Sequence, residues 1–119
     1  MNEEIKIDLK TDGDLAIFTL NESRFDSTIA GYVKGEFTIL LTDSEIKKLV
    51  IDLSNLEYCD SSGLSAILLA YRLLQGIDGE LRLANPQKGV KNLIDISQLN
   101  RILKVCDSVD QAVEELKEN

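Results

Sequence analysis

Residues 49–64 read Leu-Val-Ile-Asp-Leu-Ser-Asn-Leu-Glu-Tyr-Cys-Asp-Ser-Ser-Gly-Leu, and this stretch decides the fold. Its first part, Leu49 to Leu53, is almost continuously apolar, which is typical of a central parallel strand covered on both faces. A polar turn follows, and from Ser61 onward the apolar residues recur at helical spacing. A buried strand that leads through a turn into a helix is the basic unit of an α/β sheet.

The flanking sequence continues the same alternation. Two segments with period-2 patterning, residues 5–9 and 15–20, are joined by a turn-forming cluster, which favours a hairpin. A helix is predicted from Asp26, as its N-cap, to about Leu41. Further elements are expected downstream: a strand at 81–83, a helix around 90–94 that starts near Pro86, a short strand at 102–105, and a last helix capped by Asp107 or Ser108.

This order of elements predicts right-handed crossovers and an α/β fold. We expect a mixed sheet with a parallel centre and helices mainly on one face. A chain of 119 residues suits a single domain, residues 1–119.

The composition restricts the classes of function. Thirteen basic and 21 acidic residues give a net charge of −8, which repels nucleic-acid phosphates and anionic lipid headgroups. Histidine is absent, which removes Ser-His-Asp and Cys-His catalysis and histidine metal sites. We therefore predict no catalytic residue, no metal, no cofactor and no nucleic-acid or membrane partner. The cysteines Cys59 and Cys106 match no zinc or redox spacing, and with no signal-peptide or membrane-span pattern a cytoplasmic location is expected.

The candidate site is the turn Asp60-Ser61-Ser62-Gly63, because sites in α/β sheets form at the carboxyl ends of strands. In one interpretation Asp60 or Ser61 only caps the helix and Gly63 only permits close packing, which is the commoner case in α/β proteins. In the other, a hydroxyl in the turn is phosphorylated. A helix N-terminus tolerates a phosphate, and the added charge of about −1.5 to −2 beside Asp60 would disturb a docked partner.

Two chemical alternatives are weaker. A serine nucleophile, as in a small hydrolase, needs a base, and no lysine or carboxylate stands at a spacing that suggests one. Cys59 precedes the helix start, but the neighbouring Asp60 opposes thiolate formation, so a buried packing role is expected for this cysteine.

The sequence resembles the STAS-domain family, specifically the bacterial anti-sigma-factor antagonists. The signature over residues 49–64, the later segment Val90 to Leu99 and the order of elements carry the resemblance. It implies a binding protein and no enzyme. The unphosphorylated form would capture an anti-sigma factor that is also a serine kinase, and so release the sigma factor. Phosphorylation would end the capture, and a metal-dependent serine phosphatase would reset it.

The resemblance also implies roles for individual residues. The phosphorylated serine falls on Ser61, with Ser62 as its supporting neighbour, and Asp26 matches an acidic residue that belongs to the docking surface. The implied partner-binding residues are Asp26, Asp60, Ser61, Ser62, Gly63 and Leu64.

The chain departs from the family pattern in two places. Residues 21–25 lack a glycine that the family often has, and Gln98 stands where a glycine is common. An alternative function within the same family is a constitutive STAS scaffold or accessory protein, in a stress complex or in lipid transport, without a phospho-switch.

Overall fold

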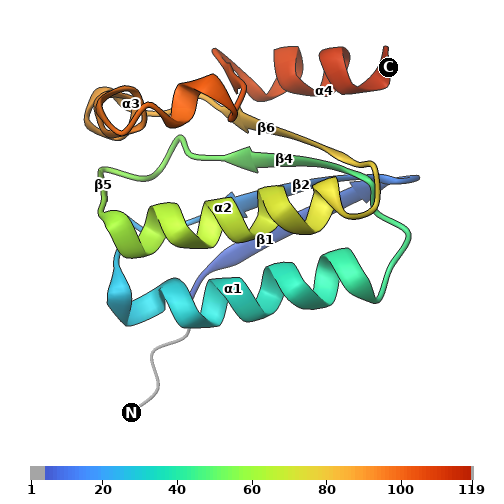
Figure 1. Ribbon diagram of the computed structural model, residues 1–119, viewed down its shortest axis with the longest axis horizontal. Coiled ribbons are helices and arrows are strands. Elements are labelled where there is room, and N and C mark those ends of the chain that lie inside the picture. Colours follow the sequence, from blue (N-terminus) through green and yellow to red (C-terminus); the bar gives the residue numbers. More distant parts are fainter. Residues whose placement is uncertain (1–4, 119) are drawn as a thin grey trace.

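The computed structural model describes residues 5–118 of the chain, and a mixed five-stranded sheet forms its centre (Figure 1). The strands, in spatial order, are β1 (Ile7–Asp12), β2 (Leu15–Leu20), β4 (Lys48–Asp52), β6 (Glu80–Ala84) and β7 (Val105–Cys106). β1 pairs antiparallel with β2, and every other neighbouring pair in this sheet is parallel. The predicted mixed sheet with a parallel centre is confirmed.

Helices cover the sheet unequally. They are α1 (Ser27–Thr42), α2 (Ser61–Gln75), α3 (Lys88–Ile96) and α4 (Val109–Lys117). α1 and α2 lie side by side on one face, whereas α4 lies on the opposite face (Figure 1). The apolar residues of α3 join the core on the α1 and α2 side, so the helices are mainly on one face, as predicted.

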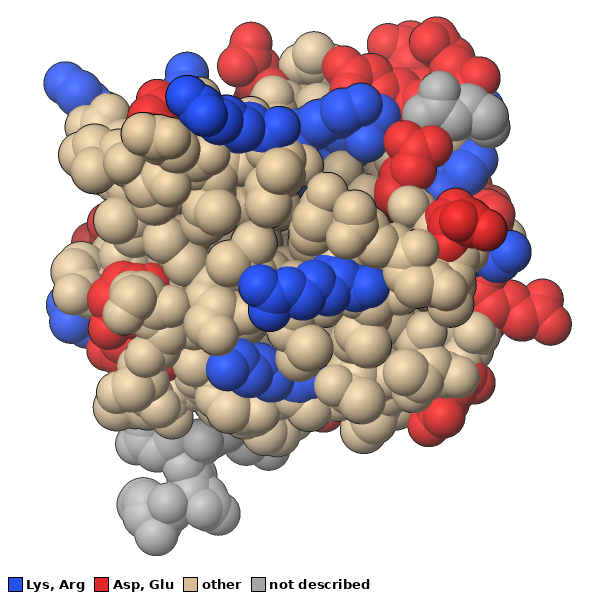
Figure 2. All heavy atoms as spheres, in the orientation of Figure 1, with Lys and Arg blue, Asp and Glu red and all other residues tan. Residues whose placement is uncertain are grey.

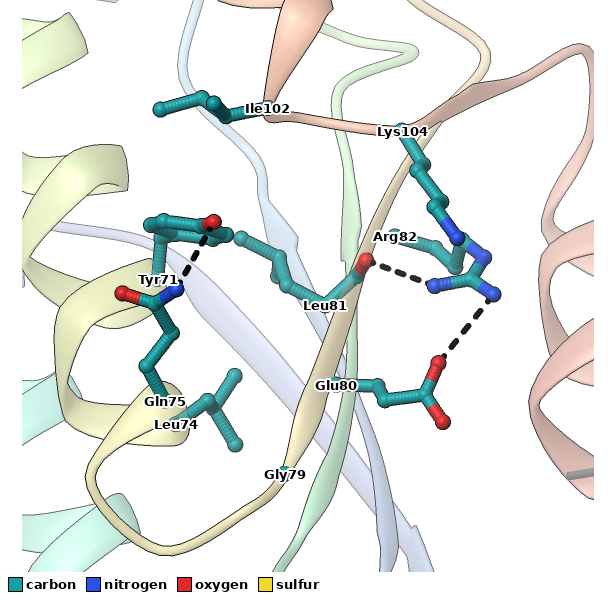
Figure 3. Close-up of a pocket in the computed structure, with 9 residues that line it drawn as sticks. All are labelled: Tyr71, Leu74, Gln75, Gly79, Glu80, Leu81, Arg82, Ile102 and Lys104. Carbon is teal, nitrogen blue, oxygen red and sulfur yellow. Dashed lines mark hydrogen bonds and ion pairs between the residues drawn. The ribbon is translucent and has the colours of Figure 1, made fainter.

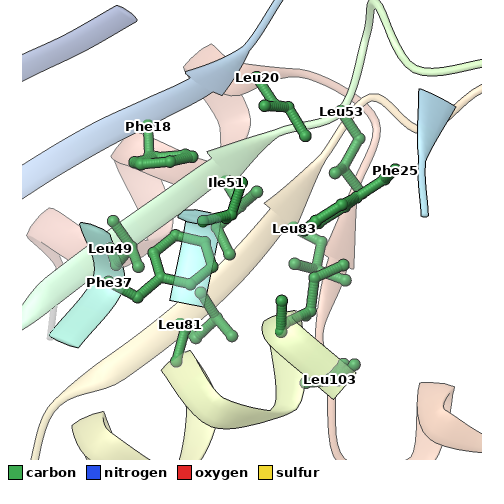
Figure 4. Close-up of a cluster of buried hydrophobic side chains, with 14 of the residues drawn as sticks. Phe18, Leu20, Phe25, Phe37, Leu49, Ile51, Leu53, Leu81, Leu83 and Leu103 are labelled. Carbon is green, nitrogen blue, oxygen red and sulfur yellow. The ribbon is translucent and has the colours of Figure 1, made fainter. Parts of the chain in front are cut away.

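The larger core lies between the sheet and the pair α1 and α2. In β4, Leu49 and Ile51 point into it while Val50 points to the other face, as strand geometry requires. The rings of Phe18 and Phe37 meet inside it with centroids 4.7 Å apart (Figure 4). Full burial of each large side chain stabilises the fold by about 1.5–3 kcal/mol.

Arg82, on the opposite face, is a charged residue with a buried side chain. Its Nε donates to Glu115 of α4 at 3.0 Å, its Nη2 lies 3.3 Å from Glu80, and its Nη1 donates to the Leu81 carbonyl at 3.1 Å (Figure 3 shows the last two). The hydrogen bond from Arg82 lowers the pKa of Glu115. The guanidinium therefore has acceptors in β6 and α4, which a buried charge requires.

A second, two-stranded sheet is formed by β3 (Arg24–Phe25) and β5 (Tyr58–Cys59), which pair in parallel. The sequence did not predict it because two residues carry no periodic pattern. Each strand leads directly into a helix, β3 into α1 and β5 into α2.

Two element boundaries differ from the predictions, and a third case settles which of two residues caps a helix. Pro86 lies before α3, which begins at Lys88. The last strand is displaced to Val105–Cys106 because Leu99–Arg101 forms a 3₁₀ turn. α4 is capped by Ser108, whose Oγ accepts from the Gln111 amide at 3.1 Å, so Ser108 and not Asp107 is the cap.

No helix within residues 5–118 is both long enough and apolar enough to cross a membrane.

Gln98 has a backbone φ of +63°, in the left-handed region where glycine is favoured. A side chain costs about 1–2 kcal/mol there, partly offset by the lower unfolded-state entropy of a residue other than glycine. Gln98→Gly should therefore raise the free energy of unfolding, measured by urea denaturation, by about 0.5 kcal/mol. The same change at Lys91, exposed within α3, should lower it by about 1 kcal/mol. Equal losses at both positions would contradict this account of Gln98.

Candidate functional site

Asp60 is the N-cap of α2. Its Oδ1 accepts hydrogen bonds from the backbone amides of Ser62 at 2.9 Å and Gly63 at 3.2 Å. These bonds satisfy two of the amides that a helix start leaves without partners. Of the two predicted capping residues, Asp60 is therefore the cap, and Ser61 is the first residue of the helix.

Ser61 is exposed, while Ser62 is half-buried. Within residues 5–118 the Ser61 hydroxyl makes no hydrogen bond, so the cap does not depend on it. A nucleophilic serine is normally hydrogen-bonded to its base, and this geometry is not present here. The hydroxyl is instead exposed in the first turn of α2.

Asp26 is the N-cap of α1. Its Oδ1 accepts from the Thr28 amide at 3.0 Å and from the Thr28 hydroxyl, and the Nε of Arg24 lies 3.3 Å from its Oδ2. The hydrogen bond from the Thr28 hydroxyl is the main cause that lowers the pKa of Asp26. The carboxylate is therefore held in its charged form at the start of α1.

The small sheet brings the two caps together. Phe25 pairs with Cys59, and the Asp60 amide donates to the Phe25 carbonyl at 3.2 Å. Asp26 and Asp60 follow these paired residues and so occupy equivalent positions in two adjacent parallel segments. The N-termini of α1 and α2 consequently face the same surface, where the positive ends of their dipoles lie beside the carboxylates of Asp26 and Asp60.

Gly63 and Leu64 lie inside the protein, which corrects the prediction that they contact a partner directly. A Cβ on Gly63 would lie 2.5 Å from the Phe25 carbonyl oxygen and 2.7 Å from the Cys59 sulfur. Leu64 is 7% exposed and belongs to the main core. Both residues act by positioning the start of α2 against β3 and β5.

Arg24 and Tyr58 are site residues that sequence reasoning missed. They are paired in the small sheet, and the Arg24 guanidinium lies 4.2 Å from the centre of the Tyr58 ring. Tyr58 is 43% exposed. The signal available in the sequence was that each directly precedes a buried residue, Phe25 or Cys59, as in a strand with one face covered.

The Cys59 thiol is free and buried. Burial, and then the charge of Asp60, raise its pKa to about 12. The expected packing role of Cys59 is consistent with this environment. In residues 5–118, no cluster of three or more histidine, cysteine or acidic side chains is placed to hold a metal ion.

Ser61 lies at the opposite end of α2 from a cavity that this helix lines. A cavity of about 220 Å³ is lined by Tyr71 and Gln75 of α2 together with residues of β6 (Figure 3). Gln75 ends α2, about 21 Å from Ser61 at 1.5 Å per residue. The face over α1 and α2 is mostly uncharged, with basic side chains near its middle and acidic side chains gathered toward its margins (Figure 2). Such a face is suited to contact with another protein.

Comparison with known proteins gives consistent matches. The model of the STAS domain family matches residues 6–112. An anti-sigma F factor antagonist of Paenibacillus polymyxa is 34% identical over 73 residues, which is 61% of this chain and 62% of that protein. The match thus spans less than two thirds of that relative's length.

Solved structures share the fold. An anti-sigma factor antagonist from Mycobacterium paratuberculosis has a TM-score of 0.85 and 19% identity, covering 96% of this chain and 95% of its own. SpoIIAA, an anti-sigma factor antagonist solved in its unphosphorylated form, has a TM-score of 0.83 and 16% identity, covering 96% and 98%. The phosphorylated form of SpoIIAA from Bacillus has a TM-score of 0.73 and 16% identity, covering 92% and 98%.

Gly63→Ala should destabilise the protein by about 1–3 kcal/mol, the usual cost of overpacking, because backbone atoms of β3 must move. Gly31→Ala in α1 is the matched control, since a Cβ there meets nothing within 4 Å. It should stabilise by about 0.5–1 kcal/mol through helix propensity. Thermal unfolding of both variants measures the difference, and equal stabilities would contradict the close approach.

The pKa of Cys59 predicts its reactivity. In a Cys106→Ala background, only about one Cys59 thiol in 10⁴ is ionised at pH 8 in the folded chain, compared with about a quarter for a free cysteine. A disulfide reagent should therefore react with the native protein orders of magnitude more slowly than with the protein in guanidinium. Similar native and denatured rates would show that Cys59 is exposed.

Proposed function

This chain belongs to the STAS domain family, and we propose that it is an anti-sigma factor antagonist controlled by phosphorylation of Ser61. In its unphosphorylated form it binds, in the cytoplasm, an anti-sigma factor that is also a serine kinase, and so releases a sigma factor. Phosphorylation ends this binding, and a serine phosphatase restores it. The observation that carries the proposal is the exposed Ser61 hydroxyl in the first turn of α2.

The proposed switch changes the charge of the surface around Ser61 and leaves the fold unchanged. Because Asp60 caps α2, a phosphate on Ser61 breaks no hydrogen bond of the cap. The helix dipoles favour the phosphate, whereas the carboxylate of Asp60 and that of the neighbouring Asp26 add to its negative field. A partner that fits the unmodified surface would then meet the phosphate and both carboxylates, about 3.5 to 4 negative charges in a small area.

The energy needed for such a switch is modest. A hundredfold loss of affinity corresponds to about 2.7 kcal/mol. A charged group left buried and unpaired at an interface costs about 2–5 kcal/mol. One phosphate can therefore supply the required change without a rearrangement of the sheet or helices.

We place the docking surface on the N-terminal ends of α1 and α2. Asp26, Asp60, Ser61 and Ser62 would line it, with the exposed Tyr58 and its stacked Arg24 at the side. The mostly neutral face that continues over both helices would extend the contact (Figure 2). With a net charge of −8, no nucleic-acid or membrane partner is proposed.

Ser61→Ala should bind the partner with the affinity of the wild type, and Ser61→Asp should bind it about a hundredfold more weakly. The partner is an anti-sigma factor captured with Ser61→Ala as bait, and calorimetry measures its affinity for each variant. Gln75→Glu adds one negative charge at the other end of α2 and should bind like the wild type. Equal affinity of Ser61→Ala, Ser61→Asp and wild type would favour the constitutive scaffold.

Phosphorylation by the captured kinase should be lost in Ser61→Ala and retained in Ser62→Ala, because Ser62 is half-buried. Mass spectrometry of both variants after incubation with ATP and the kinase locates the phosphate. Phosphate on Ser62 alone, or on neither serine, would contradict the assignment of Ser61.

A further inference from the structure

The outer edge of β1 presents free backbone groups. The Asn21 amide donates to the Lys6 carbonyl at 2.8 Å, so Lys6 directs its backbone groups to the strand that contains Asn21. In an antiparallel pair every second residue does so, and Asp8 and Lys10 therefore also direct their backbone groups to β2. The backbone groups of Ile7, Leu9 and Thr11 point away from β2. Among residues 5–118, no strand pairs with that edge.

An apolar groove runs beside the same edge. It lies between β1 and α1, has a volume of about 130 Å³, and is lined by Ile7, Leu9, Phe18, Glu36, Ile39 and Leu40. Leu9 is 46% exposed and Ile39 is 59% exposed. An unpaired edge strand next to exposed apolar side chains is a template for strand addition.

We propose that this edge binds a second copy of the chain, with the two β1 strands antiparallel and Leu9 of each copy on the two-fold axis. In that register Leu9 faces Leu9, and Ile7 faces Thr11. All three residues have outward backbone groups, so each facing pair exchanges two hydrogen bonds. The two five-stranded sheets would join into one continuous sheet.

Charge complementarity selects this register over its neighbours. With Leu9 on the axis, Asp8 of each copy faces Lys10 of the other, and Lys6 faces Asp12. A shift of β1 by two residues in one direction places Asp8 opposite Asp8, and a shift in the other direction places Lys10 opposite Lys10. Like charges directly opposite each other destabilise a strand pair, whereas opposite charges stabilise it.

The two faces of β1 would contribute differently. Asp8, Lys10 and Asp12 are exposed on the face away from α1, so their ion pairs set register and specificity more than affinity. Asp12 already pairs with Lys117 at 3.0 Å, which leaves Asp8 and Lys10 as the decisive pair. On the other face, Leu9 and Ile39 of both copies would cover the grooves.

The expected dimer is small. One strand pair and a few apolar side chains bury less than a standard interface, so association should depend on concentration. The contact uses β1 and Ile39 of α1, whereas Ser61 begins α2. A dimer of this kind leaves Ser61 of both copies accessible, and its existence does not depend on the proposed function.

Sedimentation equilibrium of the full chain and of charge variants tests the proposal. The wild type should shift with concentration from 13.2 kDa toward twice that mass. Asp8→Lys alone and Lys10→Asp alone should each weaken association by about tenfold or more, because like charges then face each other. An equimolar mixture of the two variants should associate again, because each charge now faces its opposite.

Asp95→Lys in α3 is the control for net charge and should dimerise like the wild type. Amide exchange gives a second reading: the amides of Ile7, Leu9 and Thr11 should slow as concentration rises, while that of Asp8, already directed to β2, should not change. A wild type that stays monomeric at its highest attainable concentration overturns the proposal. So does a mixture that associates no better than the single variants, because the register would then be wrong.

Discussion

The close packing of Gly63 against the backbone of Phe25 is the contact on which the site depends. It holds the first turn of α2 against β3, the strand that leads into α1. As a result, two helices that begin far apart in the sequence start at one surface, each capped by an aspartate. A side chain at position 63 would separate them, because the nearest neighbour is a carbonyl oxygen that cannot rotate away. The placement of both helix starts and their capping aspartates at one surface follows from this single approach.

Different residues of the site cap the helix, fill the core and face the solvent. Asp60 satisfies the amides at the start of α2, and Leu64 and Cys59 fill the space beneath. Ser61, between them in sequence, takes part in neither task and is exposed. This division allows a charge to be added or removed at Ser61 while the cap and the core keep their contacts. A serine that served as the cap itself would not offer this independence.

Much of the fold could be predicted because its main elements are long and regularly patterned. β2 and the cap of α1 at Asp26 lie where periodicity and capping rules placed them. The strands β3 and β5 could not be predicted, since two-residue strands have no period and their pairing is a tertiary effect. The stacking of Arg24 on Tyr58 depends on that pairing. The resemblance implied a partner-binding role for Leu64 as part of its motif, but the packing of α2 against the core, which the motif does not show, buries this side chain.

In the proposed function, phosphorylation of Ser61 changes the charge of one surface and leaves the fold intact. This proposal is tested most directly by comparing amide chemical shifts of the unmodified chain with those of a chain carrying phosphoserine at position 61. If only the local charge changes, the shift changes should be confined to residues 23–28 and 57–66, with α4 and β6 unaffected. Changes that extend through Arg82 and Glu115 to α4, on the far face of the sheet, would show a rearrangement and contradict it.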